Sequence, residues 1–311
     1  MKQVLGVLLV AALAGGGYFG WKEMEARSAH AAAVQQVVDD GEALLRGERL
    51  DPSAAQAVIR EISGLQDASD TPALLRVHAR LLLALQRPEA ARKVIAPLIL
   101  ALEPAAEDRA IGARIFRRLH GLRGDAELAG QAADYAEGHY EQTGAVETLF
   151  LAWQCARRAD RQDDAERLSG LLLDQHRETP HGRLVAALAD EDTEMSDLLS
   201  LEVAFAALPA SLDGALLPEE VEFAIAHLLL RDAKEDDSGQ LTEAIRRLEN
   251  ILTTFPADPS SRAYMAFALH RSGDRAARNA HLDWLLRNVP QDDPRREEWA
   301  RIRAEGSDGG R

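Results

Sequence analysis

Apolar residues recur at three- and four-residue spacing along most of the chain, between short breaks that contain Gly, Pro, Asp or Asn. This spacing places apolar side chains on one face of an α-helix. Three such faces are Leu74, Val77, Leu81, Leu82 and Leu85; Val94, Ile95, Leu98, Ile99 and Leu102; and Ile111, Ile115, Leu119 and Leu122. No sustained alternation of β-branched residues marks a strand. We predict an all-α fold whose short links force antiparallel neighbours.

The stretch of residues 4–21 contains no charged side chain. As a helix it would be about 27 Å long, close to the roughly 30 Å hydrocarbon thickness of a bilayer. Aromatic residues crowd its C-terminal end, where amphipathic rings favour the membrane interface. We predict an uncleaved signal anchor over residues 1–21, a single transmembrane helix in the inner (plasma) membrane. With Lys2 inside, the body lies on the extracytoplasmic (periplasmic) side.

Two other features of this segment bear on its fate. The small-x-small sequences at residues 12–14 (Ala-Leu-Ala) and 29–31 (Ala-His-Ala) fit signal-peptide cleavage, which stays an alternative to the anchor. Ala12, Gly16 and Gly20 share one helix face and would permit two helices to approach closely. A homo-oligomer is therefore compatible with the sequence.

The strongest internal signal is a period of 34 residues. Residues 239–256 read GQLTEAIRRLENILTTFP, and residues 273–290 read GDRAARNAHLDWLLRNVP. The shift pairs Gly239 with Gly273, Leu248 with Leu282, Ile251 with Leu285, Leu252 with Leu286, and Pro256 with Pro290. A fixed period with matched core positions is typical of stacked helical hairpins.

These units resemble the tetratricopeptide repeat (TPR) family, whose 34-residue unit is helix–turn–helix. The positions that carry the resemblance are Ala244, Leu248 and Pro256; Ala266, Leu269, Gly273, Leu282 and Pro290; and Ala79, Leu82, Ala91, Ile95 and Pro104. Arg278 stands where the family prefers alanine, the family's Trp and Tyr positions are mostly unfilled, and the register breaks between Pro180 and Gly239. The resemblance implies a TPR-like solenoid with a curved surface that binds proteins.

The pattern divides the chain into four parts. Residues 1–21 form the anchor, residues 22–70 linking helices, and residues 71–304 the TPR-like repeat domain. The repeat domain ends with an expected capping helix at residues 292–304, and residues 305–311 form a polar, disordered tail.

Composition narrows the class of partner. The chain has 36 basic and 51 acidic residues and a formal net charge of −15. Because nucleic-acid binders neutralise phosphates with Lys and Arg, we predict no nucleic-acid partner. At 46% hydrophobic residues, the chain is too apolar for a disordered protein. Its one cysteine excludes a disulfide framework within the chain.

No residue pattern indicates catalytic chemistry. The nine histidines lack the HExxH spacing that would place two imidazoles on one helix face for zinc. Cys155 lies among apolar residues, whereas a nucleophilic thiolate needs a nearby base and an electropositive, exposed setting. GxSxG, Walker and GxGxxG sequences are absent. We predict that the protein is not an enzyme and has no catalytic, cofactor-binding or metal-binding residues.

Two groups are candidates for a partner-binding groove. Arg114 and Arg118 are four residues apart beside an apolar stripe, and could hold a partner's carboxylates by forked hydrogen bonds. Phe267, His270 and Arg271 project from the first helix of the last repeat, and are groove candidates by the TPR resemblance.

We therefore expect a membrane-anchored TPR-like scaffold that binds proteins in or near the membrane, in assembly of a bacterial envelope complex. The anchor would raise the effective concentration of the scaffold for partners in the same membrane. One alternative is a constitutive structural subunit of a membrane complex, which a stable, obligate partner would distinguish. Another is a carrier of peptide or polysaccharide, which a ligand-dependent thermal shift would expose.

Overall fold

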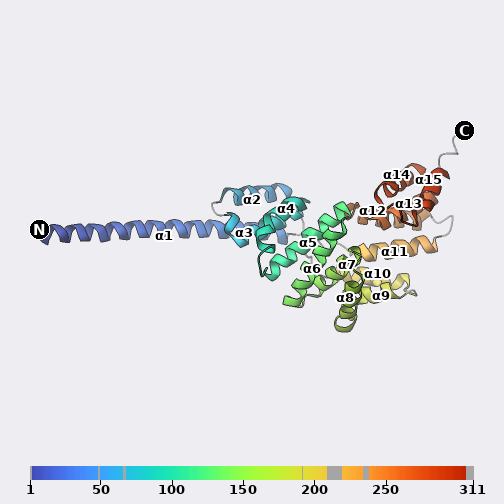
Figure 1. Ribbon diagram of the computed structural model, residues 1–311, viewed down its shortest axis with the longest axis horizontal. Helices are drawn as coiled ribbons and strands as arrows, with labels where there is room; N and C mark the ends of the chain where they lie inside the picture. The colour runs from blue at the N-terminus through green and yellow to red at the C-terminus, as the bar shows by residue number, and fades with distance from the viewer. Residues whose placement is uncertain are drawn as a thin grey trace. The chain divides into compact units, whose positions relative to one another are not determined.

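The computed structural model describes the backbone of residues 2–47, 50–65, 68–190, 192–208, 219–233 and 238–305, and side chains between residues 24 and 304 within these ranges. The described elements are all helical, which confirms the expected all-α class (Figure 1). They are α1 (Lys2–Arg46), α2 (Pro52–Gly64), the 3₁₀ turn η1 (Ala68–Asp70), α3 (Pro72–Ala84), α4 (Pro88–Ile99), α5 (Ala106–Arg123), α6 (Ala126–Thr143), α7 (Val146–Arg158), α8 (Gln162–Gln175), α9 (Pro180–Ala189), α10 (Met195–Ala206), α11 (Glu219–Asp232), α12 (Ser238–Thr254), α13 (Pro259–Ser272), α14 (Arg275–Asn288) and α15 (Arg296–Glu305).

The expected membrane span at residues 4–21 lies outside the residues whose side chains are described. Among the described residues, no helix combines the length and the apolar character needed to cross a membrane. The chain forms two compact units, Met1–Leu98 and Ile99–Arg311. The expected division at residue 70 stays a prediction, and all of the expected tail except residue 305 lies outside the described residues.

In the N-terminal unit, the end of α1 packs against α2 and α3. Gly41 of α1 faces Val77 of α3 so closely that a β-carbon at Gly41 would collide with the valine side chain. Glu42, one residue on, forms an ion pair with Arg80 of α3. A glycine at the contact and an ion pair beside it therefore fix where α1 crosses α3.

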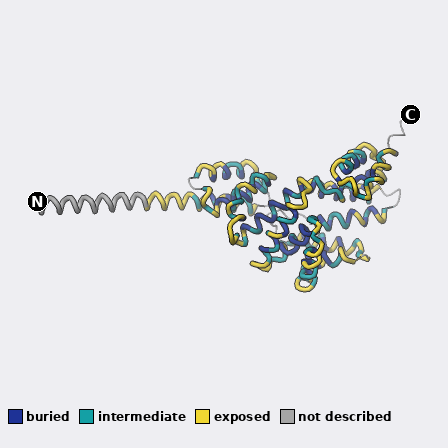
Figure 2. The backbone as a smooth tube through the Cα atoms, in the orientation of Figure 1, coloured by how far each residue is buried: buried dark blue, intermediate teal, exposed yellow. Residues whose placement is uncertain are grey.

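In the C-terminal unit, most packing is between helices that follow one another along the chain. Links of about two residues join several of them, so neighbouring helices run antiparallel. Gly124 and Gly273 end α5 and α13 with φ of 70° and 84°, a backbone conformation that glycine adopts without steric cost. Figure 2 shows the buried positions on the sides where these helices meet.

The two units of the 34-residue period are helical hairpins, α11 with α12 and α13 with α14. Leu248 and its repeat partner Leu282 are both buried, at 0% and 1% exposure. Arg278, at the family's alanine position, is also buried, and its guanidinium contacts Nδ1 of His270 at 3.0 Å. The expected capping helix is α15, which buries Trp299 but begins at Arg296 rather than at residue 292.

Two expected core positions are wrong. Leu102 is 99% exposed and Leu122 is 44% exposed. α4 ends at Ile99, so Leu102 lies in the bend that follows and not on the helix face. Leu122 lies in the last turn of α5, beyond the buried positions Ile111, Ile115 and Leu119.

The C-terminal unit departs from a simple stack in which each hairpin touches only its neighbours. The end of α12 packs back on α5, more than 130 residues earlier in the chain. Arg118 donates to the carbonyl oxygen of Thr254 at 2.7 Å, and the amide of Ala257 donates to the carbonyl of Gly121 at 3.2 Å. α7 also contacts α11, through the side chains of Gln154 and Arg158.

Phe255 lies at the centre of this return contact and is 2% exposed. The guanidinium carbons of Arg117 and Arg158 lie 5.1 Å and 4.3 Å from the centre of its ring. A β-carbon at Gly121 would lie 2.5 Å from the ring, so glycine is required for this approach. We call Arg117, Gly121, Arg158 and Phe255 the Phe255 junction. It combines burial of an aromatic ring with two cation–π contacts.

We predict that Phe255→Ala lowers the free energy of unfolding of the C-terminal unit by about 3–5 kcal/mol, because it leaves a cavity and removes both cation–π contacts. Urea unfolding followed by tryptophan fluorescence measures this, since Trp153, Trp284 and Trp299 all lie in this unit. The matched control is Phe267→Ala, because Phe267 is 48% exposed and should change stability by less than about 1 kcal/mol. Equal losses for both variants would contradict the junction's role.

Candidate functional site

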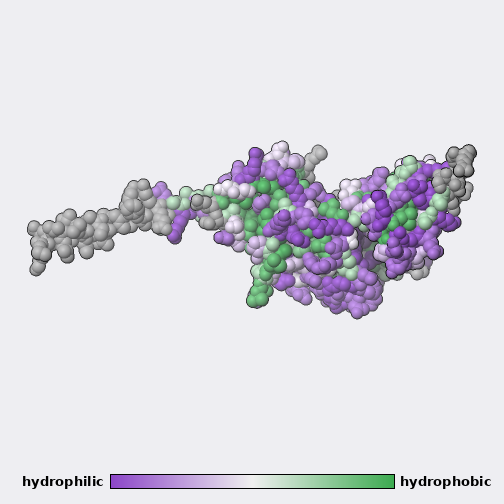
Figure 3. All heavy atoms as spheres, turned by 45° about the horizontal axis from the view of Figure 1, so that its top comes forward, coloured by the Kyte–Doolittle hydropathy of each residue, from purple (hydrophilic) through white to green (hydrophobic). Residues whose placement is uncertain are grey.

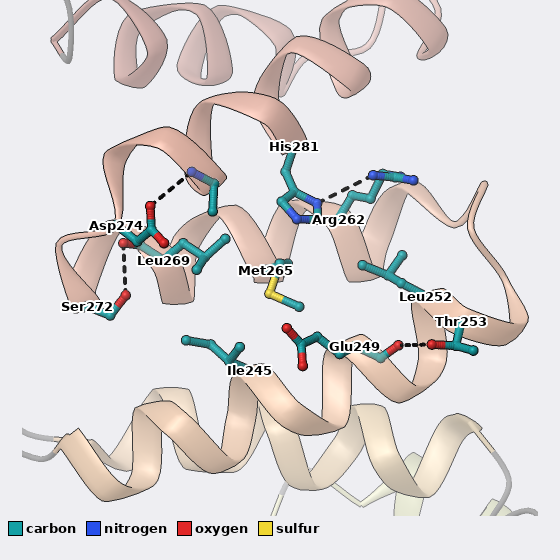
Figure 4. Close-up of a pocket in the computed structure, with 11 residues that line it drawn as sticks. Ile245, Glu249, Leu252, Thr253, Arg262, Met265, Leu269, Ser272, Asp274 and His281 are labelled. Atoms are coloured by element: carbon teal, nitrogen blue, oxygen red, sulfur yellow. Dashed lines mark hydrogen bonds between the residues drawn. The ribbon is translucent and has the colours of Figure 1, made fainter.

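An open groove with a volume of about 730 Å³ lies between α12, α13 and α14 (Figure 4). The helical repeat builds it, because each wall uses positions three, four or seven residues apart. Ile245 and Leu252 come from α12, Met265 and Leu269 from α13, and Ala277 from α14. Figure 4 shows the first four side chains converging on the cavity. We call this the α12–α14 groove.

Arg262 of α13 supplies the groove's positive charge. Its Nε and Nη2 donate to the carbonyl oxygen of Pro256 at 2.9 Å and 2.6 Å, and its guanidinium lies 4.3 Å from the ring centre of Trp284. Among the described residues it forms no ion pair with a carboxylate. Burial lowers the pKa of Arg262, although an arginine stays protonated throughout the physiological range. Arg262 is therefore a fixed cation with donor capacity left for an acid.

His281 of α14 lies beside Arg262, with Nδ1 3.5 Å from the arginine Nη1. Burial and the neighbouring guanidinium lower the pKa of His281, so the imidazole is neutral at pH 7. The exposed carboxylates of Glu249, on α12, and Asp274, before α14, also line the groove. Asp274 is the N-cap of α14 and accepts from the amide of Ala277 at 3.0 Å. The groove thus has an apolar floor, one cation and two separate acids.

A second, smaller cavity of about 390 Å³ opens beside the Phe255 junction, with walls from α7, α9, α11 and α12 and from the start of α13. Glu219 and Glu220, the first described residues of α11, lie at its base. Arg117 donates to both oxygens of Glu219, at 2.7 Å and 2.6 Å, and Arg158 lies 3.0 Å from the same carboxylate. Glu220 accepts a hydrogen bond from Gln154 and is 3.8 Å from Arg158. We call this the α7–α11 pocket.

The two adjacent carboxylates of this pocket differ in protonation. Burial disfavours the charge on Glu219, but Arg117 and Arg158 hold its pKa below its usual value. Burial and the charge of Glu219 raise the pKa of Glu220 to about 7, against the opposing effect of the two arginines. Because both arginines are committed to Glu219, Glu220 is the acid that titrates near neutral pH.

The residues expected from the sequence to bind a partner do not gather at either cavity. Arg114 is half-buried on α5, and Arg118, on the same helix, holds the carbonyl at the end of α12. Arg271 donates to the carbonyls of Leu230 and Ala233 at the end of α11, both at 2.7 Å. Their expected partner role stays a prediction, although the guanidiniums of Arg118 and Arg271 already hold helix ends.

The other two candidates lie on α13. His270 is exposed and contacts the buried Arg278, and Phe267 is 48% exposed with the Arg271 guanidinium 5.9 Å from its ring centre. α13 therefore shows Phe267 and His270 to solvent but directs Arg262, Met265 and Leu269 into the groove. The 3.6-residue period separates these two faces. It does not reveal which of them borders a cavity.

The single cysteine agrees with its sequence interpretation. Cys155 is buried in α7, and burial raises the pKa of its thiol to about 12. The thiol therefore stays protonated at neutral pH and is not a nucleophile. His181 is also buried, and its ring packs 5.1 Å from those of Phe150 and Phe205.

Outside the two cavities, the surface of the C-terminal unit exposes few large apolar side chains. Figure 3 shows mainly hydrophilic side chains on the view of this unit, with apolar side chains in separate patches. Leu199 and Val203 are exposed four residues apart on α10, and Leu188 is partly exposed on α9. Exposed apolar residues in such small groups are common on soluble surfaces and need no partner.

Comparisons with known proteins give little further information. No protein-family model matches the chain, and no curated protein matches its sequence. Among solved structures, a crystal structure of yeast Tom70 is similar with a TM-score of 0.41 and 14% identity. The match covers 87% of this chain and 63% of the Tom70 chain, so this chain spans less than two thirds of that protein. A likeness of this size supports no conclusion about function.

We predict that Glu220→Gln changes how stability depends on pH. A carboxyl whose folded pKa is raised from about 4.5 to about 7 binds its proton more tightly when folded, so wild-type stability falls as the pH rises through this range. Glu220→Gln has no carboxyl at this position, so its stability does not fall in this way as the pH rises. It should be more stable than wild type by roughly 1–3 kcal/mol at pH 8 and nearly equal at pH 5.

Tryptophan-monitored urea unfolding at pH 5, 6, 7 and 8 measures the difference. Glu249→Gln, at an exposed position in the other cavity, is the matched control and should leave the pH profile unchanged. Parallel pH profiles for wild type and Glu220→Gln would show that Glu220 is not the titrating group.

Proposed function

We propose that this chain is a membrane-anchored helical-repeat scaffold that binds segments of other proteins in the α12–α14 groove and is not an enzyme. The observation that carries the proposal is the groove itself, an open cavity of about 730 Å³ with an apolar floor and charged side chains in its lining. Cavities of this size that combine apolar walls with a few convergent polar groups are typical binding sites. The repeated hairpins give this floor a rigid support.

The chemistry of the groove favours a partner segment that places apolar side chains on the floor and a carboxylate beside Arg262. Each well-buried apolar side chain would contribute roughly 1.5–3 kcal/mol, much of which offsets the cost of ordering the segment. A carboxylate would complete the ion pair that Arg262 lacks among the described residues, and fix the direction of the segment. Glu249 and Asp274, elsewhere in the lining, would repel a misplaced acid.

The membrane part of the proposal rests on the sequence. An uncharged stretch of 18 residues after Lys2 suits a single-pass anchor in the inner membrane, with the body in the periplasm. Such an anchor would confine the groove to a layer near the bilayer and favour partners in the same membrane. Assembly of a bacterial envelope complex is a setting that would use this arrangement. The 34-residue period and its resemblance to TPR proteins support protein segments as the ligand.

We predict that a photoreactive amino acid at Thr253, on the exposed rim of the groove, cross-links in cells to a defined protein. The matched control position is Asp163, exposed on α8 and away from the groove lining. Adding Arg262→Met should lower the cross-link yield about tenfold, because a charge-assisted hydrogen bond contributes about 1.5–3 kcal/mol. Mass spectrometry identifies the product. Equal product patterns at the two positions, or a yield unaffected by Arg262→Met, would overturn the groove assignment.

We predict that the full chain stays in the membrane pellet after extraction with alkaline carbonate, because its anchor spans the bilayer. A variant that begins at Lys22 should move to the soluble fraction. N-terminal sequencing of the mature protein is the control for processing. Release of the full chain by carbonate, or a mature N-terminus after residue 14 or residue 31, would refute the uncleaved anchor.

A further inference from the structure

The α7–α11 pocket has a charge balance that the proposed scaffold role does not use. Glu219 is neutralised twice, by Arg117 and by Arg158, at distances between 2.6 Å and 3.0 Å. The side chain of Glu220 is just as enclosed, with 12% of it exposed, yet its nearest cation is 3.8 Å away. Its closest side-chain hydrogen-bond donor among the described residues is the neutral amide of Gln154. Glu220 is thus a buried acid with an incomplete counter-charge.

Two further groups in the same lining point to a missing cationic ligand. Asp258 accepts the amide of Ser261 at 2.7 Å; it forms no close ion pair with any described residue, although its charge acts on the guanidiniums of Arg158 and Arg262. The hydroxyl of Ser261 is buried, with the residue 1% exposed, and has no hydrogen-bond partner among the described residues. An unsatisfied buried hydroxyl costs free energy, so a polar ligand atom that reached it would be stabilised.

The rest of the lining limits the shape of such a ligand. Leu188, Phe223 and Ile251 give apolar walls that suit a hydrocarbon stem. Arg157 also lines the pocket, so a second positive charge on the ligand would be repelled. A volume of about 390 Å³ accommodates a chain of four or five carbons with its head group. The pocket therefore favours one cation on a short apolar stem over a polyamine.

We propose that the α7–α11 pocket binds a single primary ammonium group on a short apolar stem, as in a lysine side chain, against the carboxylates of Glu220 and Asp258. The ammonium has three donors, which match these two acids and the Ser261 hydroxyl. A free alkylamine has the same chemistry as a lysine side chain. The proposal does not depend on occupation of the α12–α14 groove, because the two cavities share no lining residue.

The binding of a cation at this place has a pH dependence with a definite sign. The charged and polar groups around Glu220 are Arg117 of α5, Gln154, Arg157 and Arg158 of α7, Glu219 and His227 of α11, and Asp258 before α13. Burial and Glu219 raise the pKa of Glu220 to about 7, so the free pocket is protonated at pH 5 and ionised at pH 8. Affinity for an ammonium should therefore fall on the order of a hundredfold from pH 8 to pH 5.

The test uses the full-length chain in detergent and ligand-observed NMR titration. The probes are N-acetyl-lysine methylamide, n-butylamine, and N-acetyl-norleucine methylamide, which has the lysine stem without the charge. We expect binding of both amines at pH 8, at least tenfold weaker binding of the norleucine probe, and loss of amine binding at pH 5. Tighter binding of the lysine probe than of n-butylamine identifies a polypeptide as the source, and equal binding identifies a free amine.

Two variants separate the site from a structural effect. Glu220→Gln and Asp258→Asn remove one charge each while keeping shape, and asparagine still caps α13. Each should weaken amine binding at pH 8 at least tenfold without weakening norleucine binding, whereas Glu249→Gln in the other cavity should change neither. No amine binding up to 20 mM, equal binding of lysine and norleucine probes, or unchanged amine binding in Glu220→Gln would each overturn the proposal.

Discussion

The C-terminal unit depends on the burial of one aromatic ring, Phe255, against the guanidiniums of Arg117 and Arg158. These groups come from the end of α12, from α5 and from α7. A stack of hairpins would bring together neighbours only, but this contact joins residues that are about 100 to 140 positions apart. Gly121 makes it fit, because any larger residue would collide with the ring. Phe255 also precedes α13, so the junction fixes where the α12–α14 groove begins.

The two arginines of the junction also set the charge balance of the neighbouring α7–α11 pocket. Both also bind Glu219, so one carboxylate is neutralised twice, while Glu220, the next residue, has its nearest described cation, Arg158, at 3.8 Å. Other arginines of this acidic chain also bind acceptor groups on other helices. Arg118 and Arg271 hold carbonyl oxygens at the ends of α12 and α11, where the helix dipole favours a positive charge. Arg262 is hydrogen-bonded to a turn carbonyl and lies over a ring, and forms no ion pair with a carboxylate of the described residues.

How far the sequence could predict this structure depended on the distance between interacting residues. Local periodicity predicted the all-α fold, and the 34-residue period located the hairpins of α11 to α14, with Leu248 and Leu282 buried as expected. The periodicity wrongly placed Leu102 on a buried helix face, because α4 already ends at Ile99. The cavities were out of reach, since Arg117 and Glu219 are 102 positions apart and no spacing rule connects them. Arg118 and Arg271 were noticed as charges, but their carbonyl partners lie on other helices.

On this account, α5, α7 and α12 form one cooperative unit around Phe255. Native-state hydrogen exchange of the full-length chain, compared between wild type and Phe255→Ala, tests this directly, because it reports the opening free energy of each helix. We predict that the amides of residues 117–123 in α5 and of residues 248–254 in α12 lose protection together, on the order of a hundredfold. Faster exchange in α12 with unchanged protection in α5 would show that the two helices open independently, and would contradict the account.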